Sequence, residues 1–131
     1  MNKILIVEDD NASRRLMKIL INDIGYTDVL ADSGELAWEI LKVNHDFDLI
    51  ITDVVLGGMT GLDLIHKIKE NPSLKDIPIY VCSSQLSKND VLSYLKVGIQ
   101  LFMEKPLNGK KLQGHILKLL EPDLSKTNYK L

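Results

Sequence analysis

Short apolar runs alternate along this chain with longer segments in which apolar residues recur at helical spacing. The runs are continuous rather than alternating, their residues are aliphatic or β-branched, and polar or turn residues bound them, which is typical of buried parallel strands. They cover residues 4–7, 49–51, 79–82 and 101–103, and a weaker run covers residues 29–31. The pattern therefore predicts five strands.

Each predicted strand is followed by a predicted amphipathic helix. Gly25, Gly98 and Pro122 follow the first, fourth and fifth helical segments, and both residue types commonly end helices. This alternation predicts an α/β fold of right-handed βαβ units, with a parallel sheet covered by helices on both faces. The apolar helical positions are Ala12, Leu16, Ile19, Leu20 and Ile24; Leu36, Ala37, Ile40 and Leu41; Leu62, Ile65 and Ile68; Val91, Leu92 and Leu95; and Leu112, Ile116, Leu119 and Leu120.

Composition narrows the class of protein. The chain has 131 residues, 45% of them hydrophobic, and a formal net charge of −2, which fits one globular domain without a basic footprint for nucleic acid or an anionic membrane. Its single cysteine, Cys82, cannot form an internal disulfide, and no stretch approaches the roughly 18 apolar residues of a membrane span. We expect a cytoplasmic domain over residues 1–121, with residues 122–131 as a tail or the start of a linker.

Polar side chains follow four of the predicted strands. Because ligands of open α/β sheets bind outside the carboxyl ends of the strands, we expect these side chains to meet at one edge. Carboxylates from two strands can hold a hard divalent cation, one carboxylate can act as a nucleophile toward phosphorus, and a lysine and a hydroxyl can hold phosphoryl oxygens. The segments are Glu8-Asp9-Asp10, Asp53, Ser83-Ser84 and Glu104-Lys105-Pro106.

Charge supports a metal at this edge. Glu8, Asp9, Asp53 and Lys105 together carry a net charge of −2 when all are ionised. Such a cluster repels itself when empty, and a bound Mg²⁺ would neutralise it. Glu8 and Asp9 fit helix capping as well, although Asp10 or Asn11 is the better candidate for the cap.

Five segments in this order resemble the receiver domain of two-component response regulators. They are residues 4–10, 48–53, 56–61, 77–84 and 98–106, and the resemblance extends from residue 3 to about residue 120. It implies a flavodoxin-like, doubly wound sheet of strand order 2-1-3-4-5 with five helices. The chain resembles stand-alone receivers, such as chemotaxis regulators, or a receiver excised from a larger regulator.

The resemblance also implies roles for individual residues. Asp53 would accept the phosphoryl group, Lys105 would bind that group, and Ser83 would move toward it while the Phe102 ring rotates. Asp9, Asp53 and the Val55 backbone carbonyl would ligate Mg²⁺ directly, and Glu8 would act mainly through a metal-bound water. From the residues alone, Phe102 fits a plain core aromatic equally well, and Lys105 fits a solvated surface lysine.

Partners follow from the same resemblance. The phosphoryl donor would be a histidine kinase or a histidine phosphotransfer protein. An unknown output protein would bind the face formed by the fourth helix, fifth strand and fifth helix, and no direct contact with nucleic acid or membrane is expected. Val55 and Gln85, each two residues after a site residue, could control water access to Asp53.

Some residues depart from the family pattern. Gly57 stands where proline is usual, so the loop after Asp53 should lose more entropy on ordering. Thr60 replaces a common aspartate. Ile99 stands where alanine is usual, and its bulk could restrict the rearrangement of Ser83 and Phe102.

Two other functions deserve comparison with a phosphorylated switch. A phosphatase of the haloacid-dehalogenase type also uses an aspartate nucleophile, but it needs an acid two residues later, where this chain has Val55. The other alternative is a non-phosphorylated interaction module on the same fold, including an FMN-binding flavodoxin. No Ser/Thr/Gly-rich phosphate loop follows the first strand, which disfavours the flavin.

Overall fold

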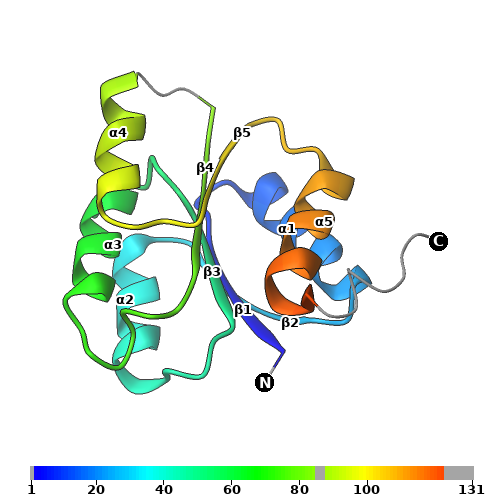
Figure 1. The fold of residues 1–131 in the computed structure, drawn as a ribbon, viewed down its shortest axis with the longest axis horizontal. Helices are drawn as coiled ribbons and strands as arrows, with labels where there is room; N and C mark the ends of the chain where they lie inside the picture. The colour runs from blue at the N-terminus through cyan, green and yellow to red at the C-terminus, as the bar shows by residue number, and fades with distance from the viewer. Residues whose placement is uncertain (1, 85–87, 123–131) are drawn as a thin grey trace.

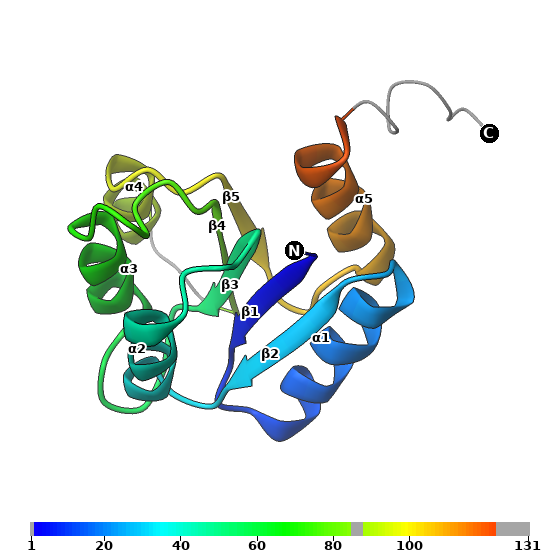
Figure 2. The same ribbon diagram turned by 90° about the horizontal axis from the view of Figure 1, so that it is seen from below.

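Five strands and five helices alternate strictly in the computed structural model, which describes residues 2–84 and 88–122. Figure 1 shows α1 and α5 on one side of the sheet and α2, α3 and α4 on the other, and Figure 2 shows the same layers from below. The elements are β1 (Lys3–Val7), α1 (Asn11–Asp23), β2 (Thr27–Ala31), α2 (Gly34–Val43), β3 (Leu49–Asp53), α3 (Gly61–Lys69), β4 (Ile79–Ser83), α4 (Lys88–Lys96), β5 (Leu101–Glu104) and α5 (Gly109–Leu120).

The strands form one parallel sheet in the order β2-β1-β3-β4-β5, which confirms the predicted fold. Its register aligns the carboxyl ends of the central strands. Val7 pairs with Thr52, Asp53 pairs with Cys82, and Ser83 pairs with Glu104. The residues that follow β1 therefore reach the same edge as those that end β3, β4 and β5.

The sheet separates two hydrophobic cores. Leu5 and Ile50 face the α2, α3 and α4 side, whereas Ile4 and Ile51 face the α1 and α5 side. Successive side chains of a strand point to opposite faces, and both faces are covered here. This burial on both sides explains why the strands read as continuous apolar runs.

The predicted faces of α1 and α4 are wrong in part, and Leu36 on the predicted face of α2 is also exposed, at 42%. In α1 the buried residues are Met17 and Ile21, while Leu16 and Ile19 are 46% and 57% exposed. In α4 the buried residue is Tyr94, whereas Leu92 and Leu95 are more than half exposed. Both helices have more apolar positions than the sheet covers, so the apolar pattern alone does not say which ones face the core.

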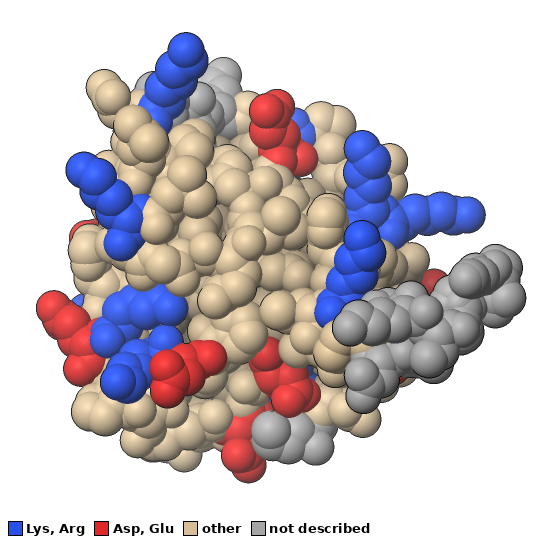
Figure 3. Space-filling model, in the orientation of Figure 1, with Lys and Arg blue, Asp and Glu red and all other residues tan. Residues whose placement is uncertain are grey.

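The face seen in Figure 3 has uncharged side chains across its middle and several Lys and Arg side chains toward its left and right margins. Among the described residues, no helix is both long and apolar enough to cross a membrane. The division between a domain at 1–121 and a tail at 122–131 stays a prediction, because residues 123–131 lie outside the described part of the chain.

Candidate functional site

Three carboxylates from two neighbouring strands meet at the carboxyl edge of the sheet. Glu8 and Asp9 follow β1, and Asp53 ends β3. Glu8 is 4% and Asp53 8% exposed, while Asp9 lies at the surface. One oxygen of each carboxylate lies within 4.8 Å of the others. Converging carboxylate oxygens are the donors that a hard divalent cation takes, so the residues fit a Mg²⁺ site.

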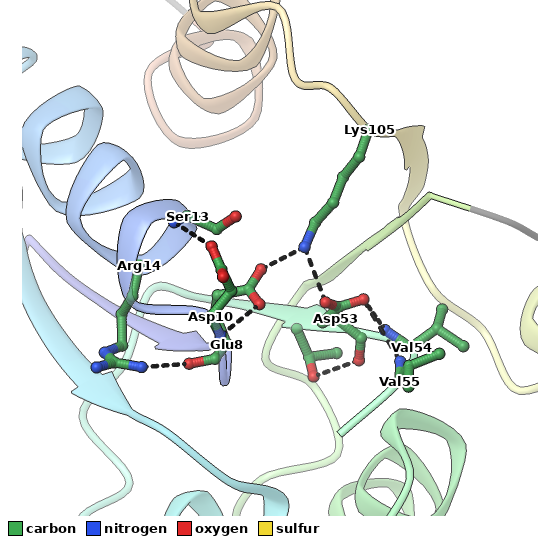
Figure 4. Close-up of polar contacts among 9 residues, drawn as sticks. Glu8, Asp10, Ser13, Arg14, Asp53, Val54, Val55 and Lys105 are labelled. Atoms are coloured by element: carbon green, nitrogen blue, oxygen red, sulfur yellow. Dashed lines mark hydrogen bonds and ion pairs between the residues drawn. The ribbon is translucent and has the colours of Figure 1, made fainter. Parts of the chain in front are cut away.

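Lys105 joins the two buried carboxylates. Its Nζ lies 2.5 Å from Glu8 Oε1 and 2.8 Å from Asp53 Oδ2, as Figure 4 shows. Burial disfavours the charge of this lysine, but its hydrogen bonds with Asp53 and Glu8 outweigh burial and raise the pKa of Lys105. The ammonium is therefore held charged beside Asp53, where it can bind a phosphoryl oxygen.

Burial has the opposite effect on Glu8. Loss of water raises the pKa of the Glu8 carboxyl, and the negative charge of Asp53 adds to that rise. Hydrogen bonds from Lys105 and from the Asp10 backbone, whose N–H lies 3.1 Å from Glu8 Oε2, only partly oppose it. Ionised Glu8 therefore carries an electrostatic cost that a bound cation would relieve.

The beginning of α1 separates the roles of the three consecutive acids. Asp10 is the N-cap, and its Oδ2 accepts the Ser13 backbone N–H at 2.8 Å. This bond lowers the pKa of Asp10. The expectation that Asp10 or Asn11 caps the helix is confirmed in favour of Asp10, which leaves Glu8 and Asp9 for the cluster with Asp53.

The backbone after β3 holds Asp53. Its Oδ1 accepts the Val54 N–H at 2.6 Å, and the Val55 N–H lies 3.4 Å from the same oxygen. A Cβ on Gly61 would lie 2.4 Å from the Asp53 carbonyl oxygen, so only glycine lets α3 begin this close to the strand. The Val55 side chain is 69% exposed beside the site, and Gln85 lies outside the described residues.

The predicted switch residues occupy β4 and β5. Ser83 is 2% exposed, and its carbonyl accepts the Lys105 backbone N–H at 2.8 Å. Phe102 is half-buried and packs against the core on the α3 and α4 side. Ile99, which the sequence singled out, is 9% exposed in the same core.

A cavity of about 350 Å³ extends from the carboxylates toward α1 and the segment after β5. Cys82 lines this cavity, and it is a small buried residue, as the sequence predicts. Burial raises the pKa of its thiol to about 12. Of the two serines that the sequence analysis placed after the fourth strand, the exposed Ser84 lines this space, whereas Ser83 is buried at the end of β4. Other lining residues include Glu8, Ser13, Met17, Asp53, Lys105 and Leu107.

Sequence reasoning missed two residues around the site. Glu35 at the start of α2 accepts a hydrogen bond from the loop after Asp53, and Tyr94 of α4 contacts Phe102. The signal for Glu35 was an acid directly after Ser33-Gly34, a position typical of a helix N-terminus. The signal for Tyr94 was a single aromatic residue beside the leucines of the fourth predicted helix.

Fold and site together define a doubly wound α/β protein with a carboxylate and lysine site at the carboxyl ends of its strands. A family model for the response regulator receiver domain matches residues 4–117. The chain belongs to this family.

Individual relatives agree with the family. Chemotaxis protein CheY1 of Helicobacter pylori is 37% identical over 112 residues, which are 85% of this chain and 90% of the relative. Among solved structures, Vibrio cholerae CheY4 superimposes with a TM-score of 0.84 at 27% identity, covering 92% of this chain and 99% of that one. The Mn²⁺-bound form of response regulator Rcp1 superimposes with a TM-score of 0.79 at 27% identity, covering 91% and 94%.

Proposed function

We propose that this receiver accepts a phosphoryl group on Asp53 from a phosphohistidine of a histidine kinase or phosphotransfer protein, and that the modification switches partner binding. The observation that carries the proposal is the setting of Asp53. Its carboxylate is nearly buried, lies 2.8 Å from the Lys105 ammonium and belongs to a three-carboxylate cluster. This setting supports Asp53 as the nucleophile and Lys105 as a group that stabilises the transferred charge.

In the transfer, a carboxylate oxygen of Asp53 bonds to phosphorus while the bond between phosphorus and the histidine nitrogen breaks. The electron pair of that bond leaves with the imidazole. Lys105 balances charge on the phosphoryl oxygens, since its ammonium already lies between Asp53 and Glu8. The product is an aspartyl phosphate, so the chain acts as a switch that is modified once rather than as a turnover enzyme.

We infer that Mg²⁺ is the cofactor, held by Asp9, Asp53 and the Val55 carbonyl, with Glu8 acting through a water. The cation supplies positive charge to the phosphoryl oxygens. Two observations support the inference. The cluster of Glu8, Asp9, Asp53 and Lys105 carries a net charge of −2 when all four groups are ionised, and the related Rcp1 has a Mn²⁺-bound form.

The proposed switch runs from Ser83 to Phe102 and on to the face of α4, β5 and α5. A phosphoryl group on Asp53 draws the Ser83 hydroxyl toward it, and the Phe102 ring follows, which biases a two-state equilibrium. Leu92 and Leu95 of α4 are 54% and 53% exposed, which suits contact with an output protein. The proposed location is the cytoplasm, where such kinases and outputs act.

The haloacid-dehalogenase alternative has no support at its key position. Val55 occupies the place of the second acid, and its side chain is apolar and exposed. Sustained turnover of a phosphomonoester would favour that alternative over a switch.

The decisive experiment measures the intact mass after incubation with Mg²⁺ and a small acyl phosphate. The wild-type chain should gain one phosphoryl group, and Asp53→Asn should gain none. Asp46→Asn is a matched control, because Asp46 is an exposed aspartate on the segment before β3, at the other end of the strand from Asp53. A mass gain that survives Asp53→Asn would refute the assignment.

A further inference from the structure

Glu35 reaches from the start of α2 to the loop that follows Asp53. Its Oε2 accepts the Met59 backbone N–H at 2.8 Å, across 24 residues of sequence. Glu35 lies in the first turn of α2, where the helix dipole favours a carboxylate. The contact joins two parts of the chain that neither the sheet register nor the apolar pattern brings together.

The loop has few other hydrogen bonds at this point, although the buried Leu56 side chain lies in the core on the α2, α3 and α4 side and Met59 packs against the same core. Near Asp53, the Val54 N–H bonds to the Cys82 carbonyl at 3.2 Å, and the Gly61 N–H bonds to the Val54 carbonyl at 3.0 Å. In the middle of the loop, no hydrogen bond joins the backbone of residues 56–58 to other described residues. Thr60 bonds to α3, through its reciprocal cap with Asp63. The Glu35 bond is thus the polar tie that connects residues 56–60 to a different element.

Two glycines allow α2 and the loop to approach each other closely at this hydrogen bond. Gly58 has φ +81°, and a Cβ there would lie 2.5 Å from Glu35 Oε2. A Cβ on Gly34 would lie 3.0 Å from Met59 Cβ. The carboxylate therefore fills the space that the missing side chain of Gly58 leaves, and the start of α2 packs directly against the loop.

We propose that Glu35 is a positioning residue for the phosphorylation site, which holds the loop after Asp53 in the conformation that binds Mg²⁺. The inference rests on the proposed function, in which the Val55 carbonyl is a metal ligand. Gly57 has no neighbouring atom within 4 Å of an added Cβ, so the space beside its backbone is open on that side. Without the Glu35 bond, the loop must lose its freedom when the cation binds, and affinity falls.

Three variants separate the hydrogen bond from the charge. Glu35→Ala removes both the acceptor and the charge. Glu35→Gln removes the charge at the helix N-terminus but keeps a side-chain oxygen that can accept from Met59. Glu39→Ala is the matched control, because Glu39 lies on the same helix and its carboxylate pairs with Lys42 at the surface.

The test measures Mg²⁺ affinity by titration calorimetry and amide hydrogen exchange at Met59 without Mg²⁺. Glu35→Ala should weaken Mg²⁺ binding by about 10-fold, the lower end of what loss of an outer partner costs a metal site. It should also speed exchange at Met59. Glu35→Gln and Glu39→Ala should stay within about twofold of the wild type on the same scale.

The outcomes also separate this inference from the proposed function. Equal Mg²⁺ affinity in Glu35→Ala and Glu39→Ala would overturn the role of Glu35, even if the wild-type chain is phosphorylated. Equal losses in Glu35→Ala and Glu35→Gln would overturn it too, since charge alone would then explain the effect. A wild-type chain that binds Mg²⁺ but gains no phosphoryl group would refute the proposed function and leave the loop measurement valid.

Discussion

The Tyr94 ring of α4 meets the Phe102 ring of β5 edge-on, with ring centroids 6.1 Å apart and an angle of 68° between the planes. Tyr94 is 3% exposed and is the buried residue of its helix. Burial raises the pKa of Tyr94 to about 12. A hydrogen bond with the Leu62 backbone, in the first turn of α3, partly opposes this rise. One side chain therefore links α4 to the predicted switch aromatic and to the helix after the Asp53 loop.

Replacement of Tyr94 should loosen α4. Tyr94→Ala should lower the free energy of unfolding by about 3 kcal/mol, because a large buried side chain leaves a cavity. Tyr94→Phe keeps the ring contact and should cost only about 1 kcal/mol for the lost hydroxyl. Urea denaturation measures both values, and hydrogen exchange in residues 88–96 reports the loosening. Similar stabilities of the two variants would show that the ring does not anchor α4.

Mg²⁺ should stabilise the folded chain, since it binds the folded cluster and not the unfolded chain. At a Mg²⁺ concentration ten times the Kd, the gain should be about 1.4 kcal/mol, visible as a higher melting temperature. Asp9→Asn should reduce the gain, whereas Asp46→Asn should not. An unchanged melting temperature of the wild type at millimolar Mg²⁺ would contradict a formed metal site.

The raised pKa of Glu8 predicts a pH-dependent stability. The folded chain holds this proton more tightly than the unfolded chain, whose carboxyl titrates near 4.5. The contribution of Glu8 is thus fully present below pH 4.5 and is lost as the pH rises through the folded pKa. Without Mg²⁺, Glu8→Gln should melt above the wild type at pH 7, and the difference should shrink toward pH 4.5.

Thermal melts between pH 4.5 and 7.5 test this expectation. With Mg²⁺ at pH 7 the wild type should melt above Glu8→Gln, because only the wild type keeps the full carboxylate cluster. Titration of Lys105 does not contribute to the difference in melting temperature. Its folded pKa is raised, so it stays charged throughout this range. A Glu8→Gln variant that melts below the wild type at pH 7 without Mg²⁺ would disprove the burial cost.

Neighbouring glycines in the Asp53 loop should respond oppositely to alanine. Gly57 has open space and no left-handed φ, so Gly57→Ala should stabilise the fold by about 0.4–1 kcal/mol through the unfolded chain. Gly58 has φ +81° and lies against Glu35, so Gly58→Ala should destabilise it by about 1–2 kcal/mol. Chemical denaturation of the pair gives the comparison, and equal effects would mean that the loop tolerates either conformation.

The apolar pattern predicted where the strands lie but not where they end. It placed the predicted strands at 49–51 and 79–82, yet β3 and β4 continue to Asp53 and Ser83. The backbone ladder extends into polar residues, because pairing depends on the neighbouring strand and not on side-chain polarity. At the sheet edge, β2 begins at Thr27 and its first four residues are exposed or half-buried, so its apolar signal was weak.

The apolar pattern could not predict contacts between residues that are far apart in the sequence. Positions after the strands predicted that Glu8, Asp53 and Lys105 would meet, and the resemblance supplied their roles. The division of labour between Asp10 and its neighbours depends on the angle at which the chain enters α1. The exposed side of α1 depends on how much of that helix the sheet covers. The tie between Glu35 and Met59 depends on the path of a loop with two glycines, which no periodicity encodes.

The chemistry of Cys82 offers a practical consequence. As the single cysteine of the chain, 3% exposed and with a thiol pKa near 12, it gives almost no thiolate at neutral pH. A second cysteine introduced at an exposed position of α4, as in Leu95→Cys, would react alone with a thiol-directed fluorophore. The native chain therefore suits site-specific labelling, and a label on α4 would report whether that helix moves on phosphorylation, as the proposed switch expects, without removing any natural residue from the core.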